Sequence, residues 1–204
     1  MRSKKELAVY LSKLLPLESH NLFLEQYSTP SELAAELVWD AHMKGDLMGR
    51  TILDAGTGSG ILGIGALLMG AKHVYFVDLD PKALKVCEAN VKKVEDEYHI
   101  GSYTITHQDI VLFDEDVDTV LTNPPFGTKQ KHADKRFLEL AFTVAPVVYS
   151  IHKTSTYVFI KAIAKDYTMN ISDKWDRQFM LRNQFHFHKK EKKYIDVTIY
   201  RFER

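Results

Sequence analysis

Apolar residues along the chain switch between helical and strand-like spacing, and this pattern defines most of the expected elements. Leucines near the start recur at helical spacing, and a second such stripe follows an irregular connection at 16–30. From residue 51 onward, short apolar runs typical of buried strands alternate with helical stretches. The expected helices are 3–15, 31–43, 61–68, 81–94, 135–145 and 155–166, and the expected strands are 51–55, 74–77, 103–107, 119–122, 147–151 and 195–202.

This alternation predicts an α/β fold with a doubly wound, mostly parallel sheet. We expect two parts, a short helical N-terminal extension (1–49) and a main domain (50–204). In sheets of this kind, ligands bind beyond the carboxyl ends of the strands. The residues that follow each strand are therefore the candidates for chemistry.

A glycine-rich turn, Asp54-Ala-Gly-Thr-Gly-Ser-Gly60, follows the first expected strand and opens a helix. Glycines at alternate positions let the backbone turn tightly and approach a ligand. The spacing also fits the dinucleotide fingerprint, since Asp78 comes 20 positions after Gly58. The turn alone thus leaves open a dinucleotide, S-adenosylmethionine or a simple packing turn.

Two carboxylates follow later strands at positions where they could bind the same cofactor. Asp78 ends the second strand and could accept hydrogen bonds from both hydroxyls of a ribose. Asp109 follows the third strand and could accept from an adenine amino group, although aspartate is also common in ordinary turns. Asp80 precedes Pro81 and is expected to cap the next helix.

The motif Asn123-Pro124-Pro125-Phe126 ends the fourth strand and carries the sharpest chemical signal. An adenine N6 amine is a weak nucleophile with two hydrogens, which the Asn123 side-chain oxygen and the Pro124 carbonyl could accept. Phe126 could stack on the base. The motif and Asp54 favour methyl transfer from S-adenosylmethionine, a reaction that needs alignment and electrostatics but no metal.

Charge is balanced overall, with 27 basic and 27 acidic residues, which argues against indiscriminate coating of nucleic acid. Two short basic clusters could still contact an RNA backbone, or could be solvated loops. One follows the Asn-Pro-Pro-Phe motif and includes Lys129, Lys131, Lys135 and Arg136; the other comprises Lys189, Lys190, Lys192 and Lys193. Phe185, Phe187 and Tyr194 flank the second cluster and could stack on unpaired bases or belong to the core.

Composition excludes several other classes of protein. The single cysteine, Cys87, rules out an intrachain disulfide and a cysteine-based zinc site, and we expect it to be a packed helical thiol. The sequence lacks a signal-peptide core and any apolar run of the ~20 residues needed to cross a bilayer. We therefore expect a cytoplasmic protein with no metal site.

The glycine turn and Asn-Pro-Pro-Phe together resemble the class I amino-methyltransferases, whose sheet has seven strands in the order 3-2-1-4-5-7-6. A closer resemblance, over almost the whole chain, is to the small-subunit ribosomal RNA N6-adenine methyltransferases called methyltransferase-like protein five. It is carried by Leu24–Pro30, Asn123–Lys129 and Phe187–Lys190. The implied substrate is one adenosine of small-subunit ribosomal RNA.

The resemblance also implies roles for individual residues. Asn123 to Phe126 would hold the target base, and the segment around Gln26 and Thr29 would form a lid over the cofactor, although it could equally be a packed connector. The implied cofactor-binding residues are Gln26, Thr29, Gly56, Ser59, Ile61, Asp78, Asp109 and Ile110.

The resemblance also implies a partner, because eukaryotic members of the family work with a small zinc-ribbon activator. The expected third strand, 103–107, would be a sheet edge without proline, lysine or glutamate to protect it. We therefore expect such a partner to add a strand there.

Three other functions stay open. Protein glutamine methyltransferases also use an Asn-Pro-Pro turn, although usually with tyrosine as the fourth residue. DNA adenine methylation is the second, although we see no sizeable target-recognition domain in the sequence. A non-catalytic RNA-binding scaffold with this fold is the third alternative.

Overall fold

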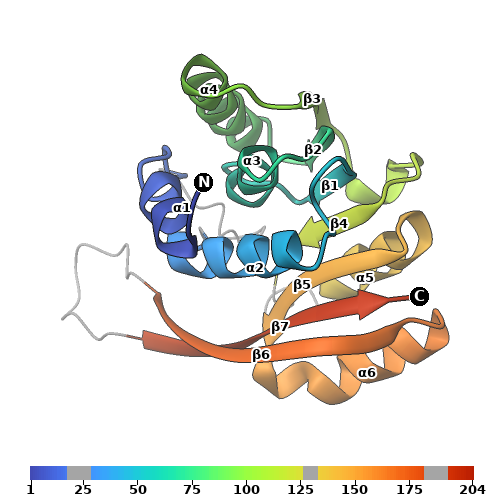
Figure 1. Cartoon of the computed structure of the whole chain (residues 1–204). Helices are drawn as coiled ribbons and strands as arrows, with labels where there is room; N and C mark the ends of the chain where they lie inside the picture. The colour runs from blue at the N-terminus through green and yellow to red at the C-terminus, as the bar shows by residue number, and fades with distance from the viewer. Residues whose placement is uncertain (18–28, 126–132, 182–192) are drawn as a thin grey trace.

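The computed structural model describes residues 1–17, 29–125, 133–181 and 193–204. These residues form one seven-stranded sheet in the order β3-β2-β1-β4-β5-β7-β6 (Figure 1). The strands are β1 (Thr51–Ala55), β2 (His73–Asp78), β3 (Ser102–His107), β4 (Thr119–Thr122), β5 (Val147–Lys153), β6 (Asn170–Leu181) and β7 (Lys193–Glu203). The first five are mutually parallel, while β7 is antiparallel to both of its neighbours. The expected doubly wound, mostly parallel sheet is confirmed.

Helices cover both faces of the sheet. The helices are α1 (Lys4–Leu11), α2 (Ser31–Met43), α3 (Ile61–Leu68), α4 (Pro81–Glu97), α5 (Ala133–Val144) and α6 (Tyr157–Asp166), with short 3-10 turns η2 (Ile110–Leu112) and η3 (Thr154–Thr156). Buried side chains of α1 to α4 form a core on one face, whereas α5 and α6 build a second core on the other (Figure 1). Because α1 and α2 share the core of α3, the N-terminal helices are an integral part of the packing.

Local signals in the sequence explain several element boundaries. Asp80 caps α4 by accepting the Lys82 N–H at 2.9 Å, as expected, and Pro81 occupies the first turn, where its missing N–H is harmless. Cys87 is fully buried in α4, which confirms the packed thiol. Within the described ranges, every helix is too short or too polar to traverse a lipid bilayer.

The sequence analysis missed one strand and set one helix boundary wrongly. The strand β6 was not located, because its polar side chains alternate poorly and its register with β7 shifts between Ile171 and Asp173. The first helix is also shorter than the expected 3–15, since regular helix ends at Leu11 and a turn follows.

Candidate functional site

Two turns leave the sheet side by side at the carboxyl ends of its central strands. Ala55 at the end of β1 is the Cα partner of Thr122 at the end of β4. The buried Thr122 hydroxyl donates to the Ala55 carbonyl at 2.8 Å, which locks the two strand ends together. The glycine turn (56–60) and the Asn-Pro-Pro turn (123–125) therefore start from neighbouring points.

The carboxylate of Asp54 fixes the glycine turn from within the core. One of its oxygens accepts hydrogen bonds from the Thr57 hydroxyl at 2.7 Å and from the Gly63 N–H at 2.8 Å. Gly63 is needed for this approach, since a Cβ there would lie 2.4 Å from a ring carbon of Phe76. Burial raises the pKa of Asp54 to about 7, even though both hydrogen bonds favour the ionised form.

Asp78 meets the same turn from the end of β2. Its two oxygens accept the N–H of Gly58 at 2.8 Å and that of Asp80 at 2.9 Å, and burial raises its pKa. The Leu79 N–H also contributes a hydrogen bond, and because a carboxylate has about four acceptor positions, Asp78 retains acceptor capacity. The arrangement therefore leaves Asp78 able to accept from a ribose hydroxyl.

Helix α5 connects the next two candidate cofactor residues. Arg136 of α5 donates to the Asp109 carboxylate at 2.9 Å, and the Phe137 ring lies so close to Gly56 that a Cβ there would approach it to 2.8 Å. Asp109 also accepts the Val111 N–H and so caps η2. The side chain of Ile110 is buried in the core, so we expect any cofactor contact of this residue to come from its backbone.

The acceptor residue Asn123 is held by the N-terminal segment. Its Nδ2 donates to the Thr29 hydroxyl at 2.8 Å, across 94 positions of sequence. Fixing the amide nitrogen in this way also fixes the direction of the amide oxygen, which is the proposed acceptor for a substrate amine. Thr29, expected beside the cofactor, thus contacts the acceptor turn directly.

A buried asparagine anchors the other described end of the same segment. Asn90 of α4 is fully buried; it accepts the Leu15 N–H at 2.7 Å and donates to the carbonyls of Leu15 and Ser59 at 3.0 and 2.9 Å. It therefore joins the N-terminal segment to the glycine turn. Sequence reasoning missed Asn90, although it is a polar residue on the apolar face of α4 and so carried a signal.

A second polar cluster lies in the core beside the Asn-Pro-Pro turn. Ser150, the register partner of Thr122, contacts His152 Nε2 at 2.6 Å, and His152 Nδ1 lies 3.8 Å from the Asp134 carboxylate in the first turn of α5. All three side chains are buried. Burial lowers the pKa of His152, and Asp134 opposes this shift. The cluster attaches the start of α5 to β5, and the sequence analysis did not identify it.

The remaining candidate residues are only partly described. The Ser59 carbonyl accepts a hydrogen bond from Asn90, and Ile61 is the first residue of α3 and has a buried side chain. Pro124 is buried beside Asn123, and Lys193 begins β7. Gln26, Phe126, Lys129, Lys131, Lys189, Lys190 and Lys192 lie outside the described residues.

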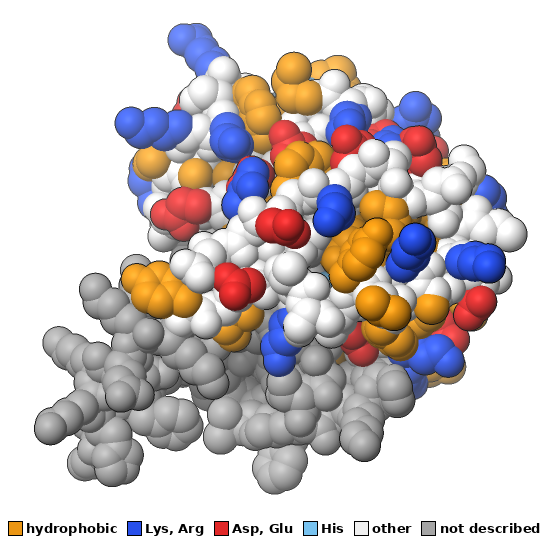
Figure 2. Space-filling model, turned by 90° about the horizontal axis from the view of Figure 1, so that it is seen from below, with side chains coloured by type: hydrophobic (Ala, Val, Ile, Leu, Met, Phe, Trp, Pro, Cys, Tyr) orange, Lys and Arg blue, Asp and Glu red, His pale blue; other side chains and the backbone are white. Residues whose placement is uncertain are grey.

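The described surface shows how the remaining basic residues are used. Lys135 and Arg136 of the first cluster form ion pairs with Glu139 and Asp109. In the view of Figure 2, basic, acidic and apolar side chains are interspersed over the described part of that face. A concentrated basic field among the described residues is therefore not visible from that side.

Comparison with known proteins gives matches over the whole length. The chain is 34% identical to the rRNA N(6)-adenosine-methyltransferase Mettl5 of Drosophila melanogaster, covering 98% of this chain and 95% of the relative. It is 32% identical to the Danio rerio METTL5 over 97% of each chain. The chain belongs to the METTL5 family.

Solved structures agree with this family assignment. A Pyrococcus horikoshii protein, proposed to be an RNA methyltransferase, superposes with a TM-score of 0.90 at 39% identity, covering 100% of this chain and 98% of that one. Magnesium protoporphyrin IX methyltransferase from Synechocystis, solved with bound S-adenosylmethionine, shares the fold at a TM-score of 0.62 and 20% identity, over 84% of this chain and 77% of that one. The present chain thus has the class I methyltransferase fold, and its fold and family both imply S-adenosylmethionine as the cofactor.

A family model described as ribosomal protein L11 methyltransferase matches residues 36–124. This range runs from α2 through the glycine turn to Pro124, so it covers the first four strands and ends within the Asn-Pro-Pro turn. The match therefore covers the strand ends expected to hold the cofactor, and α5 to β7 lie outside it.

Asp78→Ala should weaken S-adenosylmethionine binding by about 1.5–3 kcal/mol, because it removes the charged acceptor proposed for the ribose hydroxyls. Isothermal titration calorimetry measures this directly. Asp80→Ala is the matched control: it removes a helix cap worth about 1 kcal/mol of stability and should leave cofactor affinity nearly unchanged. Equal affinity losses in the two variants would show that Asp78 has no special role.

Acidification should destabilise the protein through His152. The fold lowers the pKa of this imidazole below its unfolded value of about 6.5, so the unfolded state binds more protons below that pH and acid favours unfolding. The free energy of unfolding in urea should fall below that pH by at most about 1.4 kcal/mol per unit from this group. His152→Asn should lose this component, while the same change at the exposed His107 should not; an unaltered pH dependence in His152→Asn would contradict the assignment.

Proposed function

We propose that this protein transfers the methyl group of S-adenosylmethionine to the N6 amine of an adenosine in RNA, and that the target is a single adenosine of small-subunit ribosomal RNA. The observation that carries the proposal is the position of Asn123, held by Thr29 at the end of β4 and beside the glycine turn. Relatives that match the full chain are named rRNA N6-adenosine-methyltransferases, which supports RNA as the substrate class.

The proposed chemistry is mainly alignment. Delocalisation into the ring makes the adenine amine a poor nucleophile, and its two hydrogens require two acceptors. The Asn123 amide oxygen and the Pro124 carbonyl supply them, which turns the nitrogen lone pair out of conjugation and toward the methyl donor. The bound cofactor would supply an electrophilic methyl group and leave as S-adenosylhomocysteine. The methylated nitrogen is then positively charged and readily loses one proton to solvent, so a strong general base is unnecessary.

The proposed cofactor site follows the same strand ends. Asp78 binds the ribose hydroxyls, the glycine turn lets the backbone approach the cofactor, and Asp109 accepts from the adenine amino group. Gln26, Ser59, Ile61 and Ile110 complete the proposed contacts, and Phe126 stacks on the target base.

Methylation of a protein is the second candidate, because the Asn-Pro-Pro turn could hold a glutamine amide and the family model described as ribosomal protein L11 methyltransferase matches 36–124. That range ends within the Asn-Pro-Pro turn, before α5, β5, β6 and β7, which build the rest of the acceptor side. Full-length similarity to the N6-adenosine enzymes therefore favours RNA.

Asn123→Ala should reduce methyl transfer to RNA on the order of 10²-fold or more, because an oriented acceptor at the reacting nitrogen is lost. Thr29→Ala should lower turnover only by roughly 2- to 12-fold, since it removes one orienting hydrogen bond, and Thr29→Ser should restore it. Single-turnover rates with labelled cofactor give these values, and cofactor affinity should change little.

The same assay, run in parallel on small-subunit ribosomal RNA, ribosomal protein and DNA, tests the substrate class. Digestion of the RNA product to nucleosides should yield N6-methyladenosine. Label found in protein alone, or near wild-type turnover in Asn123→Ala, would overturn the proposal.

We also propose that a small zinc-ribbon activator adds a strand to β3. The strand is an edge of the sheet, and its residues Ser102 and Thr104 are exposed. Edge strands without charged or proline residues tend to be covered by another chain, and strand addition supplies main-chain hydrogen bonds.

Placing two lysines on this edge, in Ser102→Lys/Thr104→Lys, should abolish co-purification of a zinc-containing partner. Zinc analysis of the tagged protein from its source cells measures the loss, and thermal unfolding checks that the fold is kept. Glu88→Lys is the control, because it places a lysine at an exposed position of α4 and not on the β3 edge. If both variants retain stoichiometric zinc, the activator binds elsewhere.

A further inference from the structure

Strands β6 and β7 project beyond the rest of the sheet at the edge that holds the candidate site. Pairing of β7 with β5 stops at Val197, but its pairing with β6 continues to Lys193 (Figure 1). The parallel strands present their carboxyl ends at this same edge. The projecting part therefore lies at the same edge of the sheet as the Asn-Pro-Pro turn, with β5 between them in the strand order.

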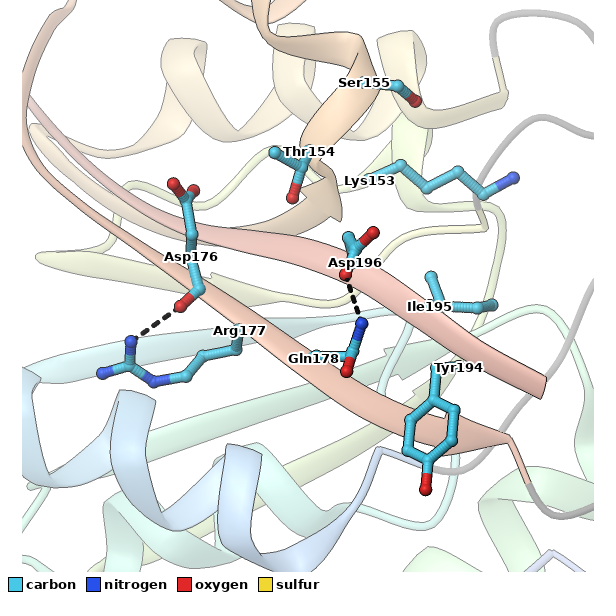
Figure 3. Close-up of a pocket in the computed structure, with 9 residues that line it drawn as sticks. All are labelled: Lys153, Thr154, Ser155, Asp176, Arg177, Gln178, Tyr194, Ile195 and Asp196. Carbon is cyan, nitrogen blue, oxygen red and sulfur yellow. Dashed lines mark hydrogen bonds between the residues drawn. The ribbon is translucent and has the colours of Figure 1, made fainter. Parts of the chain in front are cut away.

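A groove of about 810 Å³ lies where this projecting hairpin meets the end of β5. It is lined by the segment Lys153–Ser155 on one side and by side chains of both hairpin strands on the other (Figure 3). Sites for small organic ligands typically measure ~300–1,000 Å³, so the space suits one nucleotide. In the strand order β4-β5-β7, two strand spacings, about 10 Å sideways, separate the strand that ends in the acceptor turn from the hairpin strand that lines the groove.

The hairpin side of the groove carries groups suited to a nucleobase. Gln178 Nε2 donates to Asp196 Oδ1 at 2.8 Å, which fixes the amide group with its oxygen turned away from Asp196 (Figure 3). Tyr194, farther along β7, exposes 55% of its surface. The sequence left open whether Tyr194 stacks on a base or belongs to the core. Its exposure shows a surface ring that is available for stacking.

The charges in the groove argue for a base rather than a phosphate. Two carboxylates line it, Asp176 and Asp196. The two cations that also line it both have partners, since Arg177 is paired with Glu36 of α2 and Lys153 is engaged as well. Carboxylates repel phosphate but accept hydrogen bonds from amino groups. Among the bases, adenine, cytosine and guanine carry an exocyclic amine, whereas uracil presents carbonyl oxygens.

We infer that this groove binds an unpaired, amine-bearing base that flanks the target adenosine on the same RNA strand. The Tyr194 ring stacks on the base, and the Asp196 carboxylate accepts its amino hydrogen. Uridine is disfavoured at this one position because its carbonyl oxygen would face a carboxylate. The inference rests on the proposed RNA methyltransferase activity and assigns that enzyme a second point of contact with its substrate.

The test uses the wild-type chain and short single-stranded RNAs in which each position within three nucleotides of the target is replaced in turn by uridine. Replacement at one position should reduce kcat/KM roughly tenfold, the effect of one charge-assisted hydrogen bond. Tyr194→Ala should raise KM for RNA roughly tenfold with little change in kcat, whereas Tyr194→Phe, which keeps the ring, should behave like wild type.

Asp196→Asn is the decisive variant, because it keeps the shape and the bond from Gln178 but adds an amide donor that suits uridine. It should remove the discrimination at that single position, while Asp173→Asn, at the far end of the hairpin, should not. Cofactor affinity, measured in parallel, should be unchanged in every variant.

The outcomes separate the inference from the proposed function. Absence of RNA methylation by the wild type would overturn the proposed function itself. Normal methylation with uniform tolerance of uridine, an unchanged base preference in Asp196→Asn, or equal KM values for Tyr194→Ala and Tyr194→Phe would overturn the groove assignment alone.

Discussion

The hydrogen bonds accepted by the buried carboxylate of Asp54 set the geometry on which the site depends. A single oxygen binds both Thr57 and Gly63, so the strand end, the glycine turn and the first turn of α3 form one rigid unit. Burial works against this carboxylate and raises its pKa to about 7. The turn it holds then offers the Gly58 N–H to Asp78, which orients the proposed ribose acceptor. The cofactor side of the site is thus organised from the interior outward.

The acceptor side is organised differently, by contacts between segments far apart in the chain. Asn123 follows a four-residue strand and is oriented by Thr29, 94 positions earlier. Helix α5 begins soon after, attached to β5 through Asp134 and His152 and to η2 through Arg136 and Asp109. Because Phe137 of this helix also packs on Gly56, a shift of the start of α5 would displace both the acceptor turn and the glycine turn.

Elements that show a local pattern of apolar spacing, capping residues or motifs could be predicted from the sequence. The buried strands, the capped helices and the motifs at strand ends followed from spacing alone, and α2 begins and ends where expected. Strand β6 escaped because it is recognisable mainly through its pairing with β7, and its bulge near Asp173 interrupts the alternation. The Thr29–Asn123 bond had no local signal either, whereas Asn90, polar on an apolar helix face, could have been identified.

The hydrogen bonds of Asn90 and Asn123 suggest why the N-terminal extension shares the main core. A loosely attached segment could not orient an amide, because ordering it would cost conformational entropy each time a substrate bound. Here Leu15 is bound by Asn90 next to the glycine turn, and Thr29 is bound by Asn123 at the acceptor turn. The same short stretch of chain therefore has one end at each half of the site. Because α1 and α2 pack against α3, the entropy of ordering Leu15 and Thr29 is lost during folding and not when a substrate binds. The glycine turn and the acceptor turn are therefore aligned before cofactor or RNA arrives.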